Sequence, residues 1–255
     1  MVGTAGAQVE VRDLTRKFGE SNTIIDGLNL SIDAGEFVSF LGPSGCGKST
    51  LLRLIANLDQ PDLGVVKCSV DQKNHRFYRS FVFQEAHLLP WRTVLENVML
   101  PLELMRLPRS EAAQRVRDVL QRVGLDDAVA KLPAELSGGM KMRVAVARAL
   151  VSSPRLLLLD EPFAALDEVT RFRLQEDLYR LWSQERMTIL FVTHSASEAV
   201  FLSERAIVLS SKPARIVLDR KISLGRERNR KTRFAVDYVQ EVGILTQAFY
   251  QGETQ

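Results

Sequence analysis

The sequence GPSGCGKST, residues 42–50, follows the apolar run FVSFL, residues 37–41, and opens a stretch with helical periodicity. It matches the P-loop (Walker A) pattern G-x-x-x-x-G-K-[ST], in which glycines let backbone N–H groups and a helix N-terminus face a phosphate. Lys48 would place a positive charge at the β and γ oxygens of a nucleotide, and Ser49 would offer its hydroxyl to Mg²⁺. The stretch therefore predicts a strand, a phosphate-binding loop and a helix. The residues expected to contact ATP here are Gly42, Pro43, Ser44, Gly45, Cys46, Gly47, Lys48, Ser49 and Thr50.

A second motif, RLLLLDE at residues 155–161, is an apolar run that ends in two carboxylates. Ligands bind at the carboxyl edge of a parallel sheet, so we expect Asp160 beside the P-loop, where it would hold Mg²⁺. Glu161 is one carboxylate more than the metal needs, and we assign it the role of orienting or deprotonating the attacking water. These two motifs leave P-loop kinases and GTPases as possible classes.

The sequence LSGGM, residues 136–140, distinguishes these classes. Ser137 is expected to cap a helix whose first turn contains Gly138 and Gly139, and each glycine costs about 1 kcal/mol relative to alanine. That cost indicates that something approaches the backbone closely, and an anion is the obvious candidate at a helix N-terminus. A P-loop small-molecule kinase would not explain this motif, and it would also need an acceptor site and lid arginines.

With this motif the chain resembles the ABC ATPase family, whose signature is LSGGQ, and the resemblance extends over nearly the whole chain in the family's order. The resemblance implies that Phe18 stacks on adenine, that Gln84 links Mg²⁺ to a helical insertion, and that His194 is a switch histidine near the γ-phosphate. AALD, residues 164–167, matches the loop that crosses the dimer. The catalytic residues implied are Glu161, His194 and Gln84, the metal ligands are Ser49, Gln84 and Asp160, and the further ATP contacts are Phe18, Ser137, Gly138, Gly139 and Asp167.

Two positions depart from the family's pattern. Met140 replaces the usual glutamine of the signature, which leaves the phosphate contacts expected from Ser137 and the glycine backbone in place. Phe18 stands where tyrosine is more common, and stacking needs the ring rather than the hydroxyl.

Hydrophobic patterning predicts an α/β fold. Alternation within residues 9–11 and 28–32 predicts two antiparallel strands near a sheet edge, with a turn around Asp26 and Gly27 between them. From residue 37 onward, short apolar runs separated by helical segments predict a mainly parallel sheet covered by helices. These runs are FVSFL, RSFVFQ, RLLLLD, TILFVTH and RAIVLS.

No convincing strand pattern lies between Gln84 and Pro154, where periodicity predicts helices at residues 93–105, 110–123 and 137–151. Ser110 is the expected N-cap and Gly124 the expected C′ residue of the middle helix.

The expected architecture is a P-loop ABC cassette with a mainly parallel sheet, an N-terminal antiparallel β subdomain and an α-helical insertion. Its nucleotide-binding domain would span residues 8–234, with the insertion at about 85–153 and a short C-terminal tail at 235–255. We interpret the basic residues after Lys212 as a solvated, partly helical tail.

Composition bounds the remaining classes. The 255 residues are 45% hydrophobic and carry a net charge of +3, which gives no case for nucleic-acid binding. No apolar run approaches the length of about 20 residues that spans a membrane, and the N-terminal sequence MVGTAGAQVEVRD has no signal-peptide pattern. Cys46 and Cys68 are too few for a metal cluster or a disulfide framework, and we interpret Cys46 as a donor of its backbone N–H. A cytoplasmic chain is expected.

The resemblance implies a homodimer, or a pair of cassettes, in which each ATP lies between the P-loop of one subunit and the signature of the other. It implies a separate transmembrane permease that docks near EAHLLPWRTVLENV, from Glu85 to Val98, and places the chain on the inner face of the cell membrane. A periplasmic or extracellular solute-binding protein would take part indirectly. The motifs look most like subunits of importers of nitrate, sulfonate, taurine or related solutes. The alternatives are a soluble ABC ATPase in DNA repair, chromosome organisation or translation, and the ATPase of an exporter.

Overall fold

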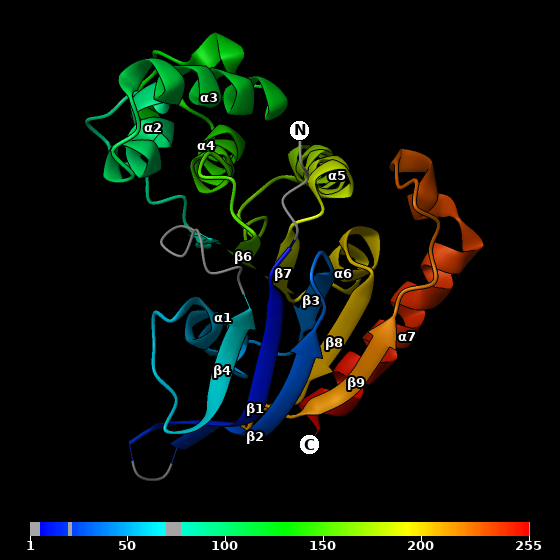
Figure 1. Ribbon diagram of the computed structural model, residues 1–255. Coiled ribbons are helices and arrows are strands. Elements are labelled where there is room, and N and C mark those ends of the chain that lie inside the picture. The colour runs from blue at the N-terminus through cyan, green and yellow to red at the C-terminus, as the bar shows by residue number, and fades with distance from the viewer. Residues whose placement is uncertain (1–5, 20–21, 70–77, 255) are drawn as a thin grey trace.

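The computed structural model describes residues 6–19, 22–69 and 78–254, so the first five residues of the N-terminal stretch lie outside the described residues. Its larger sheet has the strand order β5-β6-β7-β3-β8-β9 (Figure 1). All neighbours in this sheet pair in parallel except β8 and β9, so the predicted mainly parallel sheet is confirmed. The strands are β3 (Phe37–Leu41), β5 (Arg79–Val82), β6 (Leu156–Asp160), β7 (Thr188–Thr193), β8 (Arg205–Leu209) and β9 (Ile216–Lys221).

The central strands are apolar throughout because both faces of the sheet are covered. In β3, Phe37 and Leu41 pack toward α4, α5, α6 and α7, whereas Val38 and Phe40 pack toward α1 and the second sheet. The covering helices are α1 (Lys48–Ala56), α4 (Gly138–Leu150), α5 (Glu168–Glu185), α6 (Ala196–Leu202) and α7 (Val236–Glu253).

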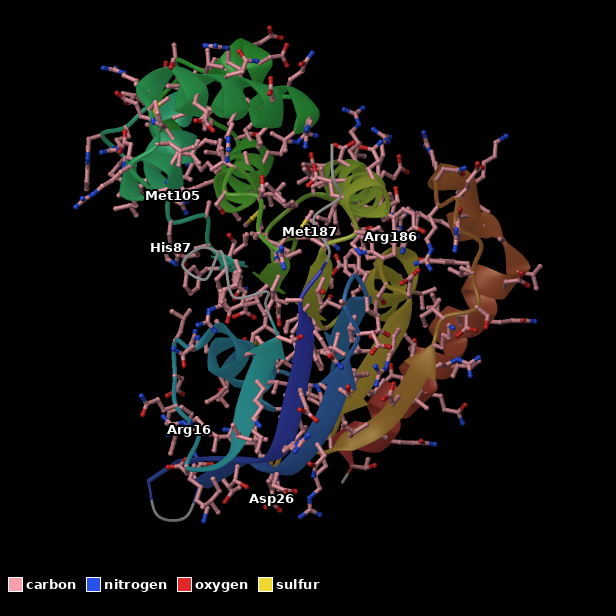
Figure 2. The ribbon with its side chains drawn as sticks, viewed as in Figure 1. Arg16, Asp26, His87, Met105, Arg186 and Met187 are labelled. Atoms are coloured by element: carbon pink, nitrogen blue, oxygen red, sulfur yellow. The ribbon has the colours of Figure 1, made fainter. Side chains whose placement is uncertain are left out.

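The smaller sheet is antiparallel and has the order β2-β1-β4, formed by β1 (Gln8–Phe18), β2 (Asn22–Ile32) and β4 (Leu63–Ser69). The expected antiparallel pair is present, but the predicted turn at Asp26 and Gly27 is wrong. Both residues lie inside β2, where the register passes from Leu28 opposite Leu14 to Ile25 opposite Arg16. Three residues of β2 therefore match two of β1, and Gly27, with φ 59°, accommodates a β-bulge. Figure 2 places Arg16 and Asp26 at the end of the molecule opposite Met105.

The helical insertion consists of α2 (Val94–Leu104), α3 (Arg109–Arg122), two short 3₁₀ helices, η1 (Asp126–Ala128) and η2 (Pro133–Glu135), and α4. No strand occurs among its described residues, as the patterning predicts. Thr93 caps α2 with a capping box, and Gly124, with φ 66°, is the C′ residue of α3, as expected. The predicted N-cap Ser110 is wrong, because Pro108 is the N-cap residue and Ser110 lies within the first turn. Proline is well suited to a helix start because it lacks an N–H group that would need a partner there.

The chain after Lys212 packs on the domain rather than forming a solvated tail. It contains the edge strand β9, the short helix η3 (Arg230–Phe234) and α7, which runs along β8 and β9 (Figure 1). The Arg228 guanidinium is buried and donates to the carbonyls of Val200, Phe201 and Ser203, the C-terminal end of α6. Basic residues in this segment are therefore partly structural, and the interpretation of a solvated tail is wrong for them.

Within the described residues, no helix combines the length and the apolar character needed to cross a membrane.

Trp182 tests the packing of α5 against the sheet. It is 1% exposed, its Nε1–H donates to the Gly35 carbonyl at 3.2 Å, and its ring meets that of Phe37 edge-on at 5.6 Å. Arg186 and Met187, marked in Figure 2, lead from this helix end into β7. We expect Trp182→Ala to lower the free energy of unfolding by about 3–5 kcal/mol, because it leaves a cavity and removes that hydrogen bond.

The measurement is equilibrium denaturation followed by circular dichroism. The control is Trp91→Ala, which changes the only other tryptophan, a side chain that is 73% exposed. It should change stability by about 0.5 kcal/mol or less. Equal losses in the two variants would contradict this account of the core.

Candidate functional site

The P-loop joins β3 to α1 and bends back on itself. Gly47 has φ 117°, and a Cβ at this position would stand 2.9 Å from Ile24 Cγ2, so only glycine fits. Lys48 begins α1 and is 4% exposed. Its Nζ donates to the carbonyl oxygens of Gly42 and Pro43, each at 2.7 Å. The ammonium is thereby held at the mouth of the loop, where a phosphate oxygen would replace a carbonyl as its partner.

A groove opens above this loop and gathers half of the predicted ATP contacts. Phe18 lies at its rim, 52% exposed, with the Arg16 guanidinium 5.1 Å from its ring. An exposed aromatic ring at this position is suited to stacking on a base. The predicted residues that line the groove are Phe18, Ser44, Gly45, Gly47, Lys48, Ser49, Thr50, Gln84 and Glu161.

Sequence reasoning missed three other residues that line the groove, namely Asn22, Ile24 and Lys212. Lys212 was identifiable, because it follows β8 at the carboxyl edge of the sheet, where a cation meets phosphate. Asn22 and Ile24 enter through β2, and no local motif marks them.

The two oxygen-bearing side chains predicted to hold Mg²⁺, Ser49 and Asp160, meet beside the P-loop. Ser49 Oγ donates to Asp160 Oδ1 at 2.7 Å, and Asp160 is 6% exposed. Burial raises the pKa of the Asp160 carboxyl above its usual value, because desolvation disfavours the charged form. Gln84 follows β5 and lines the same groove. One carboxylate, a hydroxyl and an amide fit Mg²⁺, which keeps several waters and binds phosphate oxygens besides few protein ligands.

Glu161 and His194 form a hydrogen-bonded pair beside the groove. His194 Nδ1 lies 3.0 Å from Glu161 Oε2. Glu161 adopts φ 46°, a left-handed conformation rarely found for non-glycine residues, and its N–H donates to the Val192 carbonyl. The strained backbone aims the carboxylate away from the strand and toward the histidine that follows β7. This geometry brings together the base and the switch histidine that the sequence predicts.

The signature residues lie elsewhere in the chain. Ser137 caps α4 by accepting from the Met140 N–H at 3.3 Å, and Asp167 caps α5 by accepting from the Thr170 N–H at 2.9 Å. The Thr170 N–H also holds the pKa of Asp167 below its usual value. A Cβ on Gly139 would meet Thr170 Cγ2 at 2.5 Å, so the two helix starts pack together. Among the described residues that line the groove there is none of these four, Ser137, Gly138, Gly139 and Asp167.

Cys46 is 1% exposed, and burial raises the pKa of its thiol. A buried, protonated thiol is a poor nucleophile, which supports the interpretation that Cys46 contributes its backbone rather than redox chemistry.

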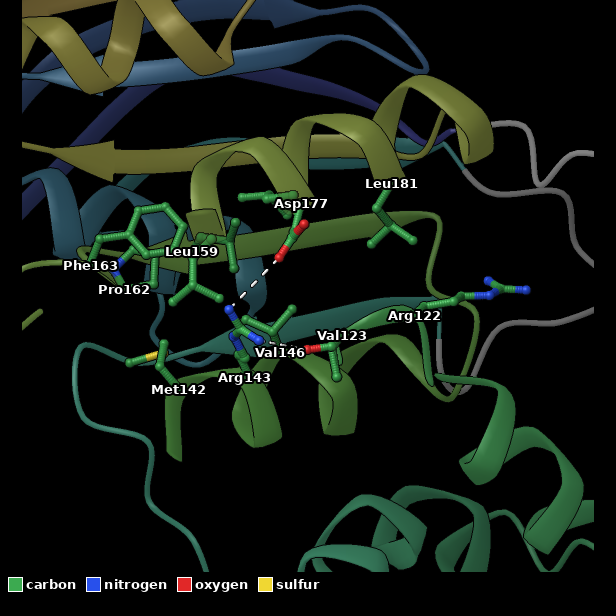
Figure 3. Close-up of a pocket in the computed structure, with 12 residues that line it drawn as sticks. Arg122, Val123, Met142, Arg143, Val146, Leu159, Pro162, Phe163, Asp177 and Leu181 are labelled. Atoms are coloured by element: carbon green, nitrogen blue, oxygen red, sulfur yellow. Dashed lines mark hydrogen bonds and ion pairs between the residues drawn. The ribbon is translucent and has the colours of Figure 1, made fainter. Parts of the chain in front are cut away.

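A separate cavity, mostly apolar, lies between α4, α5 and β6 (Figure 3). Met142, Leu159 and Phe163 line it, and Arg143 Nη2 lies 3.9 Å from Asp177 Oδ2 across it. Its lining belongs to the junction of the helical insertion with the sheet, directly after Glu161.

A parallel sheet with a P-loop, an acidic pair and a histidine on its carboxyl edge, together with a capped helix start in an all-helical insertion, defines a P-loop ATPase cassette. Comparison with known proteins agrees. A family model described as ABC transporter matches residues 25–164. The chain belongs to the ABC transporter family and is an ATPase of its cassette type.

Among its relatives, an uncharacterized ABC transporter ATP-binding protein of Methanocaldococcus jannaschii is 43% identical, over 92% of this chain and 90% of the relative. An aliphatic sulfonates import ATP-binding protein of Pseudomonas fluorescens is 46% identical, over 88% of this chain and 81% of the relative. A dimeric ATP-binding cassette solved in a post-hydrolysis state with ADP and Pi is 34% identical with a TM-score of 0.73, covering 85% of this chain and all of that one.

The Ser49–Asp160 contact predicts that Ser49 contributes to ATP affinity only when Mg²⁺ is present. We expect Ser49→Ala to weaken ATP binding in the presence of Mg²⁺ by about tenfold, because the metal loses a hydroxyl ligand. Binding measured with EDTA should be nearly unchanged, since Lys48 and the loop N–H groups remain. Titration calorimetry under both conditions is the measurement.

Ser49→Thr is the matched control, because it keeps the hydroxyl and the P-loop pattern admits threonine at this position. An equal loss of affinity with and without Mg²⁺ would contradict the assignment.

Proposed function

We propose that two copies of this chain bind two ATP molecules between them and energise import of a small solute through a separate transmembrane permease. The observation that carries the proposal is the separation, within one chain, of the nucleotide groove from the capped starts of α4 and α5. Ser137 and Gly138 are exposed at the start of α4, and a Cβ on Gly138 would meet open space. A second copy related by two-fold symmetry would bring these N–H groups to the free side of each ATP.

In the proposed reaction, Glu161 accepts a proton from a water molecule as that water attacks the γ-phosphorus, and the bond between the γ-phosphorus and the bridging oxygen breaks. His194 is placed to orient the γ-phosphate and the Glu161 carboxylate, 3.0 Å from its Nδ1. Lys48 and the loop N–H groups stabilise charge on the phosphate oxygens. Ser49, Asp160 and Gln84 would hold Mg²⁺, which when bound would neutralise negative charge on the phosphates.

Glu161→Gln tests the role of the carboxylate. The amide retains the shape of the side chain but accepts a proton poorly, so ATP binding should persist while hydrolysis falls by about a hundredfold or more. With its ATP uncleaved, the variant should elute as a dimer in ATP and as a monomer in ADP.

Phosphate release and size-exclusion chromatography with light scattering measure the two outcomes. Normal hydrolysis by Glu161→Gln would overturn the assignment of the base.

The segment 85–98 is our candidate for permease docking. Asn97 is fully buried and holds the loop before α2, bonding with its amide to Leu89, Arg92 and Thr93. Leu88 packs against the core, whereas Trp91 projects with 73% of its surface exposed. A rigid loop that presents one large aromatic side chain is typical of an interface anchor. Association on this face would keep the chain peripheral on the inner face of the cell membrane.

The transported solute is proposed to be an aliphatic sulfonate or a related small anion. Several relatives named as aliphatic sulfonates import ATP-binding proteins are 43–46% identical over 85–89% of this chain. The permease and a solute-binding protein outside the membrane would recognise the solute, because the contacts proposed for this chain are with nucleotide, with a second copy and with the permease. This likeness favours an importer over an exporter or a soluble ATPase of DNA repair or translation.

Trp91→Ala tests docking and transport together. Tagged wild-type protein purified from detergent-solubilised membranes should recover a multi-spanning permease. The variant should recover about tenfold less, because it lacks the side chain that would be buried against the permease. Uptake of an alkanesulfonate should fall in parallel, while the basal ATPase rate stays unchanged.

Phe234→Ala is the control, since Phe234 is an equally exposed aromatic residue, at 81%, on the C-terminal segment. Recovery of only soluble or nucleic-acid-bound companions by the wild-type chain would refute the transporter proposal. Permease recovery without sulfonate uptake would refute the solute class alone.

A further inference from the structure

The residue before His194 has a hydroxyl that organises the peptide on both sides of the histidine. Thr193, the last residue of β7, is 1% exposed. Its Oγ1 donates to Glu198 Oε2 at 2.5 Å and accepts from the Ser195 N–H at 3.0 Å. The buried hydroxyl of the residue before His194 therefore holds the backbone N–H of the residue after it.

Glu198 anchors that hydroxyl from the first turn of α6. It is 8% exposed, and burial raises the pKa of its carboxyl. Its Oε1 accepts from Gln175 Nε2 at 3.0 Å, and Gln175 is fully buried in α5. A carboxylate buried this deeply is costly unless hydrogen bonds satisfy it, so its position is strongly determined.

The same network extends to the C-terminal segment. Arg233 Nη2 donates to Gln175 Oε1 at 2.6 Å, and its guanidinium lies 3.7 Å from the centre of the Phe201 ring. Arg233 thereby holds the Gln175 amide in the orientation that directs its NH₂ group toward Glu198. On the other side, Arg171 Nε lies 3.8 Å from Glu198 Oε1, and Arg171 Nη2 donates to the Leu166 carbonyl at 2.8 Å. Glu198 thus lies between the loop that carries His194 and the loop that precedes α5.

We propose that Thr193 and Glu198 are positioning residues for ATP hydrolysis, which hold the His194 imidazole against the Glu161 carboxylate. The His194 side chain is 55% exposed, so apart from its hydrogen bond with Glu161 neighbouring side chains constrain its ring little, and the position of its backbone matters more. The inference rests on the proposed role of His194. Misplacement of a catalytic group by about 1 Å costs about a hundredfold in rate, so loss of this anchor reduces turnover without removing any group that touches ATP.

Two substitutions at Thr193 separate positioning from packing. Thr193→Val keeps the shape of the side chain and removes the hydroxyl, whereas Thr193→Ser keeps the hydroxyl and removes a methyl group. We expect Thr193→Val to lower kcat by about tenfold or more, with KM for ATP within about twofold of wild type. Thr193→Ser should retain most of kcat. The reverse order, with serine impaired and valine active, would show that only packing matters and would overturn the proposal.

Glu198→Gln is the second variant, and it guards against a folding defect in Thr193→Val. It should lower kcat in the same direction, and the double variant should lose no more than about twofold beyond Thr193→Val, because the two residues act as one unit. Additive losses would overturn the proposed link. Thermal unfolding of each variant with and without ATP identifies any that is misfolded.

His194→Ala, measured in the same assay, distinguishes the two levels of the argument. If His194→Ala hydrolyses ATP normally, the proposed role of His194 fails. If His194→Ala loses activity and Thr193→Val does not, the role of His194 stands and the positioning role is refuted.

Discussion

The parallel pairing of β7 with β3 on one side and β6 on the other is the constraint on which the site depends. In this register Leu41 lies opposite Thr193, and Asp160 lies opposite Val192. The three strands therefore end at the same level, and the residues that follow them meet at one edge. The P-loop, Glu161 and His194 are distant in sequence, and a shift of β7 by one residue would move His194 away from Glu161 and turn the β7 side chains to the opposite faces.

That register is secured by burial on both faces of the sheet. Alternate residues of β3 enter two different hydrophobic clusters, so the strand contributes to the packing on both faces of the sheet. The stability of this packing compensates for local costs at the site, where Glu161 occupies a left-handed conformation and Asp160 is a buried carboxylate. Strain and desolvation of this kind persist only where the surrounding structure determines the geometry, and here the sheet does so.

The features predictable from the sequence are those in which chemistry and local structure coincide. GPSGCGKST needs its glycines for the bend and offers its lysine to a phosphate, and RLLLLDE is at once a buried strand and a proposed metal site, so each motif carries its own context. The prediction of a turn at Asp26 and Gly27 was wrong because an Asp-Gly pair suits a turn and a bulge equally. Which of the two forms depends on pairing with β1. In α7, the buried residues Tyr238, Leu245 and Ala248 stand among apolar residues that are exposed, such as Val239 and Tyr250, so the sequence alone does not mark the face that packs on the domain.

The hydrogen bonds around Glu198 were not predictable for the same reason. Thr193, Gln175 and Arg233 belong to a strand, a helix and the C-terminal segment, and no spacing in the sequence relates them. Their arrangement nevertheless has a physical logic. The role proposed for His194, facing a γ-phosphate, requires it to remain exposed, so its orientation cannot come from packing of its own ring. A buried polar network reached through the preceding residue supplies that orientation, because hydrogen bonds at a strand end are directional where hydrophobic contacts are not. The exposed histidine and the buried glutamate are thus two parts of one requirement, access to the nucleotide with a defined geometry.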